Sequence, residues 1–378
     1  MVLQNEATRC IYQTEDMGQL SIQHMLGYFE QMGVMRVSDL HIKAGAPPTY
    51  RVDGDLKKLK GPILTKESAE QLILPLLSES SLEKLRELHS VDCSYRLSST
   101  HFRINVFKEN DGICAAIRAL PAEIPTVENI GFPNDIWKDI INRKHGLVLI
   151  TGVTGAGKST TIASLINRIT EERADRVITI EDPIEYIFEQ KRSLVSQREI
   201  GKDVYSFIDG LRSMLREDPD VVFVGEMRDA ETIAMTLMAA ETGHLVFSTL
   251  HTRDTAGTIT RILDYFPPGR QNEVRNQLSL GLAYIVSQKL IPCSDGHGRV
   301  AAMEVLNNNY AIANLIRAGK IEQIYSQLQT KMQNRHDEKM ITMERHLAQL
   351  VRDEKVDILE AQKWANSLTT FNEAINME

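Results

Sequence analysis

The chain has 378 residues, of which 42% are hydrophobic and 25% charged, an ordinary balance for a globular protein of two or three domains. Its formal net charge of -8 argues against binding nucleic acid through bulk positive charge. Four cysteines lie far apart, without a Cys-x-x-Cys pair, so neither a zinc site nor a disulfide framework is indicated. No apolar stretch approaches the length of a membrane span, which favours a cytoplasmic chain that reaches a membrane only through partner proteins.

Residues 1–120 predict a small α+β domain. Residues 1–18 are polar and predict a loosely ordered start. Apolar residues at helical spacing predict a helix beginning near Ile22, and residues 65–87 carry the same periodicity with an interruption at Pro75. Strand-like runs are found at residues 38–42, 50–52, 91–95, 102–107 and 113–117, with Asp53-Gly54 as a hairpin turn after the second.

A change of pattern follows residues 121–136, a segment with prolines and a glycine that predicts a linker. Residues 137–378 predict an α/β domain, because apolar strands alternate with helices and favour a parallel sheet covered on both faces. From about residue 305 we expect the chain to be helical. The expected strands span residues 147–151, 177–180, 221–224 and 245–250.

The most informative stretch is GVTGAGKS at residues 152–159, which fits the phosphate-loop pattern of Gly, four residues, then Gly-Lys-Ser. An apolar strand-like run precedes it and a helical pattern follows, so a chance Gly-rich turn is disfavoured. Glycines let backbone N–H groups turn toward phosphate oxygens, Lys158 adds a positive charge, and Ser159 offers a hydroxyl to Mg²⁺. We therefore expect ATP and Mg²⁺ to bind, with the nucleotide held by Gly152, Val153, Thr154, Gly155, Ala156, Gly157, Lys158, Ser159 and Thr160.

Acidic residues cluster where the strand at residues 177–180 ends. Glu181, Asp182 and Glu185 lie around Pro183, which gives the chain a sharp exit from the strand. These carboxylates could hold a water for attack on the γ-phosphate or support the metal. The alternative is a solvated acidic turn.

Glu226 follows the apolar strand at residues 221–224. An apolar strand that leads to an acid is the general form of a second phosphate-site motif, whose carboxylate reaches Mg²⁺ through water. The pattern alone is weak, because many strands end in Glu.

His244 and His251 flank the apolar strand at residues 245–250. A single histidine is more often a structural residue than a catalytic one. Two at the ends of one strand favour phosphate sensing or coupling between subunits.

Together these motifs resemble the secretion ATPase superfamily, and within it the PilT/PilU branch of type IV pilus retraction motors. The resemblance covers about residues 20–350 and rests on several motifs in the same order. They are EDPIEY at 181–186, REDPD at 216–220, GEMRD at 225–229, TGH at 242–244 and TLHT at 249–252. SDLH at 38–41 and VDG at 52–54 match the N-terminal domain of the family. The resemblance implies a RecA-like parallel-sheet ATPase domain, a smaller PAS-like α+β domain at the N-terminus, and C-terminal helices.

The resemblance also implies roles for single residues. Lys158 and Ser159 are the nucleotide-site residues. Glu185 takes the position of the catalytic glutamate, with Glu181 in the same acidic box, and Glu226 is the Walker B acid that reaches Mg²⁺ with Ser159. The remaining residues expected at the site are the histidine pair, His244 and His251, and two arginines of the N-terminal domain that reach the phosphates, Arg103 and Arg118.

Two departures from the family pattern concern the subtype. The retraction signature normally reads Ala-Ile-Arg-Asn-Leu, but Ala313 stands here where the arginine is expected. The segments at 266–270 and 303–306 look more like PilU than PilT. An accessory, PilU-like role is therefore predicted. The extension branch of pilus motors is disfavoured because its zinc-binding cysteine pairs and longer N-terminal region are absent.

We thus expect an ATP-hydrolysing hexameric motor that drives or assists pilus retraction. Its expected partners are its own copies in a homohexamer, the inner-membrane pilus platform protein and a second PilT-type ATPase, and no nucleic acid. It would be cytoplasmic and peripheral to the inner membrane. The alternatives are another secretion-type ATPase, a RecA-like nucleic-acid motor, and a nucleotide-binding regulator without turnover; the presence of Glu181, Glu185 and Glu226 counts against the last.

Overall fold

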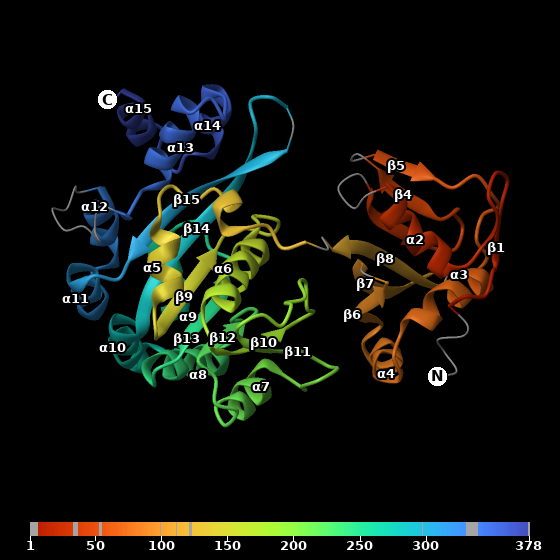
Figure 1. Cartoon of the computed structure of the whole chain (residues 1–378), viewed down its shortest axis with the longest axis horizontal. Coiled ribbons are helices and arrows are strands. Elements are labelled where there is room, and N and C mark those ends of the chain that lie inside the picture. Colours follow the sequence, from red (N-terminus) through yellow and green to blue (C-terminus); the bar gives the residue numbers. More distant parts are fainter. Residues whose placement is uncertain are drawn as a thin grey trace. The chain divides into compact units, whose positions relative to one another are not determined.

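The structure, a computed structural model, forms two compact units (Figure 1). The first comprises Met1–Glu123, Asp182–Ile187 and Glu199–Asp203, and the second comprises Ile124–Glu181, Phe188–Arg198 and Val204–Glu378. Two short segments from within the predicted α/β region, Asp182–Ile187 and Glu199–Asp203, therefore group with the N-terminal unit. The residues described are 7–32, 37–52, 55–98, 100–110, 112–120, 123–296, 298–329 and 339–376.

The first unit is built on a six-stranded antiparallel sheet with the order β5-β4-β3-β8-β7-β6. Its strands are β3 (Val37–Ile42), β4 (Thr49–Val52), β5 (Asp55–Lys58), β6 (Ser90–Leu97), β7 (Thr100–Glu109) and β8 (Gly112–Leu120). Its helices are α2 (Ile22–Met32), α3 (Lys66–Ile73), the short 3₁₀ helix η1 (Leu74–Leu76) and α4 (Glu79–Leu88). These elements confirm the α+β prediction, including the helix interruption at Pro75.

One face of this sheet carries the core. In β7 the side chains of Phe102, Ile104 and Val106 are fully buried, while Arg103 between them points to the other face. Helices α2 and α3 pack on the sheet, and the Phe29 ring meets Phe102 edge to face at 5.4 Å between centroids. The opposite face is thereby left to polar side chains.

The N-terminal segment corrects one expectation. Residues 12–20, predicted to be loosely ordered, form a hairpin of β1 (Tyr12–Thr14) and β2 (Gly18–Leu20). Tyr12 is 3% exposed, and its hydroxyl donates to the Pro62 carbonyl at 2.9 Å. This contact with a residue 50 positions later fixes the hairpin, and polar composition gave no sign of it. The hairpin turn predicted at Asp53-Gly54 lies outside the described residues.

The second unit is built on a seven-stranded sheet with the order β11-β10-β12-β13-β9-β14-β15. Strands β10, β12, β13, β9 and β14 run parallel, and β15 is antiparallel to β14. Every residue of β9, β12 and β13 is buried, so both faces of the central sheet are covered, as predicted. The strands are β9 (Gly146–Thr151), β10 (Arg176–Glu181), β11 (Leu194–Glu199), β12 (Val221–Val224), β13 (Leu245–Leu250), β14 (Leu282–Pro292) and β15 (Arg299–Asn307).

The C-terminal boundary of this sheet differs from the prediction. Helical structure was expected from about residue 305, but β15 continues to Asn307 and the helices begin at Tyr310. None of the described helices is both long and apolar enough to cross a membrane. The helices of the unit are η2 (Val127–Ile130), α5 (Ile136–Asn142), α6 (Lys158–Glu172), α7 (Phe207–Met214), α8 (Ala230–Glu241), α9 (Thr255–Asp264), η3 (Pro268–Arg270), α10 (Gln271–Gly281), α11 (Tyr310–Ala318), η4 (Ile321–Gln323), α12 (Ile324–Gln329), α13 (Met343–Arg352), α14 (Ile358–Trp364) and α15 (Leu368–Asn376).

Candidate nucleotide site

The predicted phosphate loop connects the carboxyl end of β9 to the first residue of α6. Gly157 precedes the helix in a left-handed conformation, with φ of 83°, which glycine adopts without strain. Lys158 is 8% exposed, and its ammonium donates to the carbonyls of Gly152 at 3.0 Å and Val153 at 3.2 Å. The lysine thus folds back over its own loop, and the amino end of α6 opens beside it. This arrangement can hold an anion.

Glu226 lies two residues beyond the end of β12. In the sheet, β13 separates β12 from β9. Its carboxylate pairs with Arg228 at 2.9 Å and lies 3.5 Å from Nε2 of His251. Burial raises the pKa of the Glu226 carboxyl, but the hydrogen bond and charge of Arg228, together with other nearby positive charge, bring the pKa below its usual value. The charge of Lys158 acts in the same direction, so the loop lysine and this carboxylate lie within electrostatic reach.

His251 follows the carboxyl end of β13, next to Glu226. Burial lowers the pKa of its imidazole, and the positive charge of Lys158 lowers it further. The ring is therefore neutral near pH 7 and can both donate and accept a hydrogen bond. Sequence spacing placed this histidine at a strand end, and the structure brings it to the acid.

His244 lies at the other end of β13. Its Nδ1 is 2.8 Å from the Ala239 carbonyl and 3.2 Å from the Thr242 hydroxyl, both at the end of α8. The two predicted histidines are therefore separated by the length of the strand. Within one chain the structure joins only His251 to Glu226.

Glu181 is the last residue of β10 and is 6% exposed. Its Oε1 accepts a hydrogen bond from the Thr179 hydroxyl at 2.6 Å and one from the Gln197 amide at 3.2 Å. The carboxylate is thereby fixed at the strand end.

The other three predicted residues belong to the first unit. Glu185 is half-buried in the segment Asp182–Ile187. Arg103 and Arg118 are direct cross-strand partners in β7 and β8, on the polar face of the antiparallel sheet. Arg118 donates through Nε to Oδ1 of Asp39 at 2.8 Å, while Arg103 lies 3.8 Å from Asp92.

Sequence reasoning missed two residues of the site: one contacts the phosphate loop and the other contacts Glu226. Arg228 was seen only as part of the GEMRD motif, and its pairing with Glu226 was not foreseen. Gln288 of β14 hydrogen-bonds to the loop residue Ala156, 132 positions earlier. No local signal marks Gln288, because its strand was not predicted.

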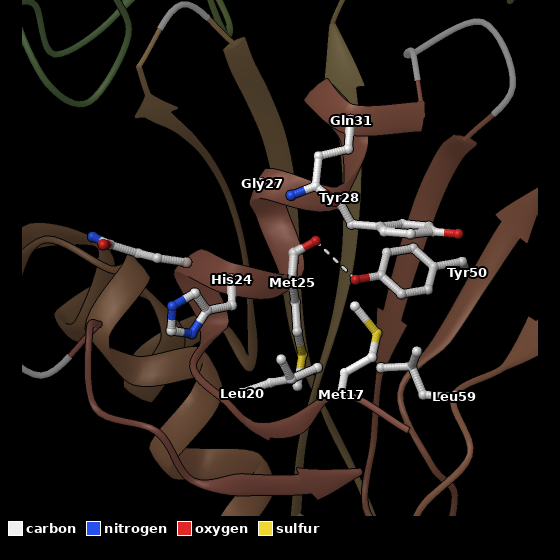
Figure 2. A pocket seen from close by; sticks show the side chains of 10 residues that line it. Met17, Leu20, His24, Met25, Gly27, Tyr28, Gln31, Tyr50 and Leu59 are labelled. Atoms are coloured by element: carbon white, nitrogen blue, oxygen red, sulfur yellow. Dashed lines mark hydrogen bonds between the residues drawn. The ribbon is translucent and has the colours of Figure 1, made fainter. Parts of the chain in front are cut away.

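A cavity of about 230 Å³ lies in the first unit, and Figure 2 shows it beside α2. The ring of Tyr28 lies next to that of Tyr50, whose hydroxyl donates to the Met25 carbonyl at 2.8 Å. None of its described lining residues is a lysine or arginine, so it lacks the charge that a triphosphate requires. The lining consists of Met17, Leu20, Gln23, His24, Met25, Gly27, Tyr28, Gln31, Tyr50 and Leu59.

A parallel sheet with a glycine-rich loop between β9 and α6 is the architecture of phosphate-loop nucleotide-binding proteins. Residues 21–376 match the family described as "Type II/IV secretion system protein", and the chain belongs to this family. The family predicted from the sequence motifs is thereby confirmed.

Known relatives cover most of the chain. It is 43% identical to the type IV pilus retraction ATPase PilT of Pseudomonas aeruginosa, over 82% of this chain and 89% of the relative. It is 35% identical to the type IV pilus ATPase PilU of the same organism, over 87% and 85%. A crystal structure of the pilus retraction motor PilT with bound ADP matches with a TM-score of 0.83 and 43% identity, over 94% of this chain and 99% of that one.

Proposed function

We propose that this chain is an ATP-hydrolysing motor that drives or assists retraction of type IV pili. The observation that carries the proposal is the phosphate loop at the end of β9, with Lys158 within electrostatic reach of Glu226. Its likeness to PilT and PilU over more than four-fifths of the chain supports the pilus assignment. The motor would work as a homohexamer in the cytoplasm and meet the inner membrane through the pilus platform protein.

The loop amides and Lys158 bind the phosphates, and Ser159 and Glu226 are the residues that would hold Mg²⁺. The fit is chemical: a hydroxyl and a carboxylate whose pKa is lowered are the oxygen ligands that Mg²⁺ takes, usually with several waters. When bound, the ion neutralises charge on the β- and γ-phosphates. Neutral His251 can sense the γ-phosphate by hydrogen bonding while it contacts Glu226.

Glu185 orients or deprotonates the attacking water. The acidic segment offers Glu181 as the competing residue. Glu181 is almost fully buried and already accepts from Thr179 and Gln197, which suits a structural anchor. Glu185 is half-buried, which suits a group that contacts water, and this contrast supports our assignment.

Arg103 and Arg118 contribute to hydrolysis from the N-terminal unit. A guanidinium can grip phosphate oxygens in a planar, bidentate manner and stabilise charge on the transferring group. ATP would then draw the PAS-like domain toward the ATPase domain, and loss of the γ-phosphate would release it. His244, remote from Glu226 in its own chain, is assigned to coupling between subunits.

The balance between driving and assisting rests on two observations. Identity to PilT is higher than to PilU, 43% against 35%. In contrast, Ala313, in helix α11, replaces the arginine of the retraction signature. We favour a PilU-like dependence on a second PilT-type motor.

The decisive experiment is to purify the chain and measure ATP hydrolysis with and without Mg²⁺ and the pilus platform protein, and its mass in solution. We expect Mg²⁺-dependent turnover, stimulation by the platform protein and a hexamer. In cells, deletion should weaken retraction under load while the second motor still retracts pili. Stimulation by nucleic acid instead of the platform protein would contradict the pilus assignment. Complete loss of retraction despite a working second motor would make this chain the principal motor.

A further inference from the structure

Strand β14 brings a buried amide to the phosphate loop. It runs parallel to β9 on the side away from β13, with Ser287 paired with Thr151, the last residue of β9. Gln288 is therefore level with Gly152, where the loop begins. The two backbones approach so closely that a Cβ on Gly152 would lie 2.5 Å from the Gln288 carbonyl oxygen. Only glycine fits there, because neither backbone can give way.

Both ends of the Gln288 side chain are used. Its Nε2 donates to the carbonyl of Ala156, and its Oε1 accepts from the Thr161 hydroxyl at 2.9 Å. The residue is 2% exposed, so water does not compete for these bonds. One amide thus ties the end of the loop to the first turns of α6.

The bond to Ala156 fixes the next N–H as well. In a trans peptide the C=O of one residue and the N–H of the next point in opposite directions. Holding the Ala156 carbonyl toward β14 therefore turns the Gly157 N–H away from β14. The Gln288 amide fills the space between Gly157 and β14, since a Cβ on Gly157 would lie 3.1 Å from Nε2 of Gln288.

We infer that Gln288 is a positioning residue for the nucleotide: it holds the Ala156–Gly157 peptide in the orientation that presents the Gly157 N–H to a phosphate. The inference rests on the proposed function, because it assumes that this loop binds the phosphates. Without Gln288 the peptide would have to be oriented by the nucleotide itself, which weakens binding.

The adjacent residue provides a matched control. Lys289 is the next residue of the strand, and successive strand residues point to opposite faces of the sheet. Its ammonium donates to the Trp364 carbonyl and to Asn366 Oδ1, both at 2.6 Å, and so contacts the C-terminal segment instead of the loop. Gln288→Met and Lys289→Met therefore each remove two hydrogen bonds from neighbouring positions of β14 with the same replacement.

The experiment measures affinity for fluorescent ADP and ATP, KM and kcat, and the melting temperature without nucleotide. We expect Gln288→Met to weaken nucleotide binding and raise KM about tenfold, the equivalent of one to two hydrogen bonds, with a much smaller change in kcat. Lys289→Met should lower the melting temperature and leave affinity within about twofold. Unchanged affinity in Gln288→Met, with a lowered melting temperature, would reduce Gln288 to a structural residue.

Two further variants keep the result decisive. Thr161→Val removes only the hydrogen bond from the Thr161 hydroxyl to Gln288 and should weaken nucleotide binding about threefold. If Gln288→Met does not fold, this variant tests the inference in its place. Unchanged nucleotide binding in Thr161→Val would then overturn the inference. Lys158→Ala tests the proposed function separately. If Lys158→Ala loses nucleotide binding while Gln288→Met keeps it, only the inference fails. Normal binding in Lys158→Ala would mean that the proposed site itself is wrong.

Discussion

The two sheets of this protein carry their charged residues in different places. In the parallel sheet every residue of β9, β12 and β13 is buried, so Lys158, Glu226 and His251 lie beyond the strand ends. These three strands contain no charged residue, because a charge buried between two covered faces is costly.

The antiparallel sheet of the first unit instead carries charge across one face. Arg51 pairs with Asp39, Asp39 with Arg118, and Arg118 with Arg103 in neighbouring strands, so the four side chains form a row. We call it the arginine row. Asp39 is 6% exposed. Its Oδ1 lies 2.8 Å from Nε of Arg118, and its Oδ2 lies 3.8 Å from Nε of Arg51. The loop site depends on backbone geometry, and the arginine row depends on side-chain pairing. Substitutions should therefore cause a large loss of ATP hydrolysis at the loop and smaller losses in the arginine row.

The largest effect is expected at the loop. Lys158→Ala should abolish measurable ATP hydrolysis, because it removes the charge that faces the outer phosphates. The fold should survive, since the ammonium donates to carbonyls of its own loop, those of Gly152 and Val153. Steady-state turnover and thermal melting check both statements. Arg168→Ala, farther along the same helix and paired with Glu128, is the control and should hydrolyse ATP normally.

The next effect separates the two acids. Glu185→Gln should bind ATP and hydrolyse it about 10²–10⁴-fold more slowly, the usual loss for a general base or water-positioning group. Single-turnover hydrolysis and nucleotide affinity are the measurements. A dead Glu181→Gln beside a nearly normal Glu185→Gln would reverse our assignment.

A smaller effect is expected in the arginine row. Arg118 donates only its Nε to Asp39 among the described residues, and 65% of its side chain is exposed, so its two terminal nitrogens can face a phosphate. Arg118→Ala should lower turnover about tenfold, as for loss of a charged hydrogen bond, and weaken nucleotide binding less. Retraction should be lost with it. Arg103→Ala should act in the same direction.

The control lies in the same row. Arg51→Ala removes the other arginine beside Asp39 and should change turnover less than about twofold, as for an exposed ion pair. Arg118→Lys should restore little activity, because lysine lacks the planar fork. Normal hydrolysis and retraction in both Arg103→Ala and Arg118→Ala would make them ordinary surface residues.

The smallest effect tests how strictly the layers on the parallel sheet exclude charge. His346 of α13 is 2% exposed and accepts a hydrogen bond at Nδ1 from the Met303 amide of β15 at 2.8 Å. Burial lowers the pKa of His346 to about 4, against about 6.5 when unfolded. The unfolded chain therefore takes up the proton first as pH falls. The stability present above pH 6.5 should drop by about 1 kcal/mol at pH 5.5 and further toward pH 4.

Denaturant unfolding at pH 7.5 and 5.5 measures this change. His346→Gln keeps an acceptor for the Met303 amide and should reduce the difference in the free energy of unfolding between the two pH values. His145→Gln, at an exposed position, is the control and should keep it. Equal losses in the wild type and in His346→Gln would show that this histidine is not the group responsible.

The sequence by itself determined the elements that depend on neighbouring residues. The phosphate loop, the helix after it, the strands β10, β12 and β13 and the helix break at Pro75 all follow from local periodicity and from glycine and proline chemistry. The motifs also determined the family, because several of them occur in a fixed order.

Only the tertiary structure decided which distant residues meet. Gln288 reaches Ala156 across 132 positions, Arg118 reaches Asp39 across 79, and neither pairing leaves a local pattern. The same holds for β14, whose place beside β9 is set by sheet order, and for the histidines, of which only His251 contacts Glu226. Periodicity reports which way a side chain faces along its own strand. Contacts between strands depend on sheet order and register, which the packing of the whole sheet fixes.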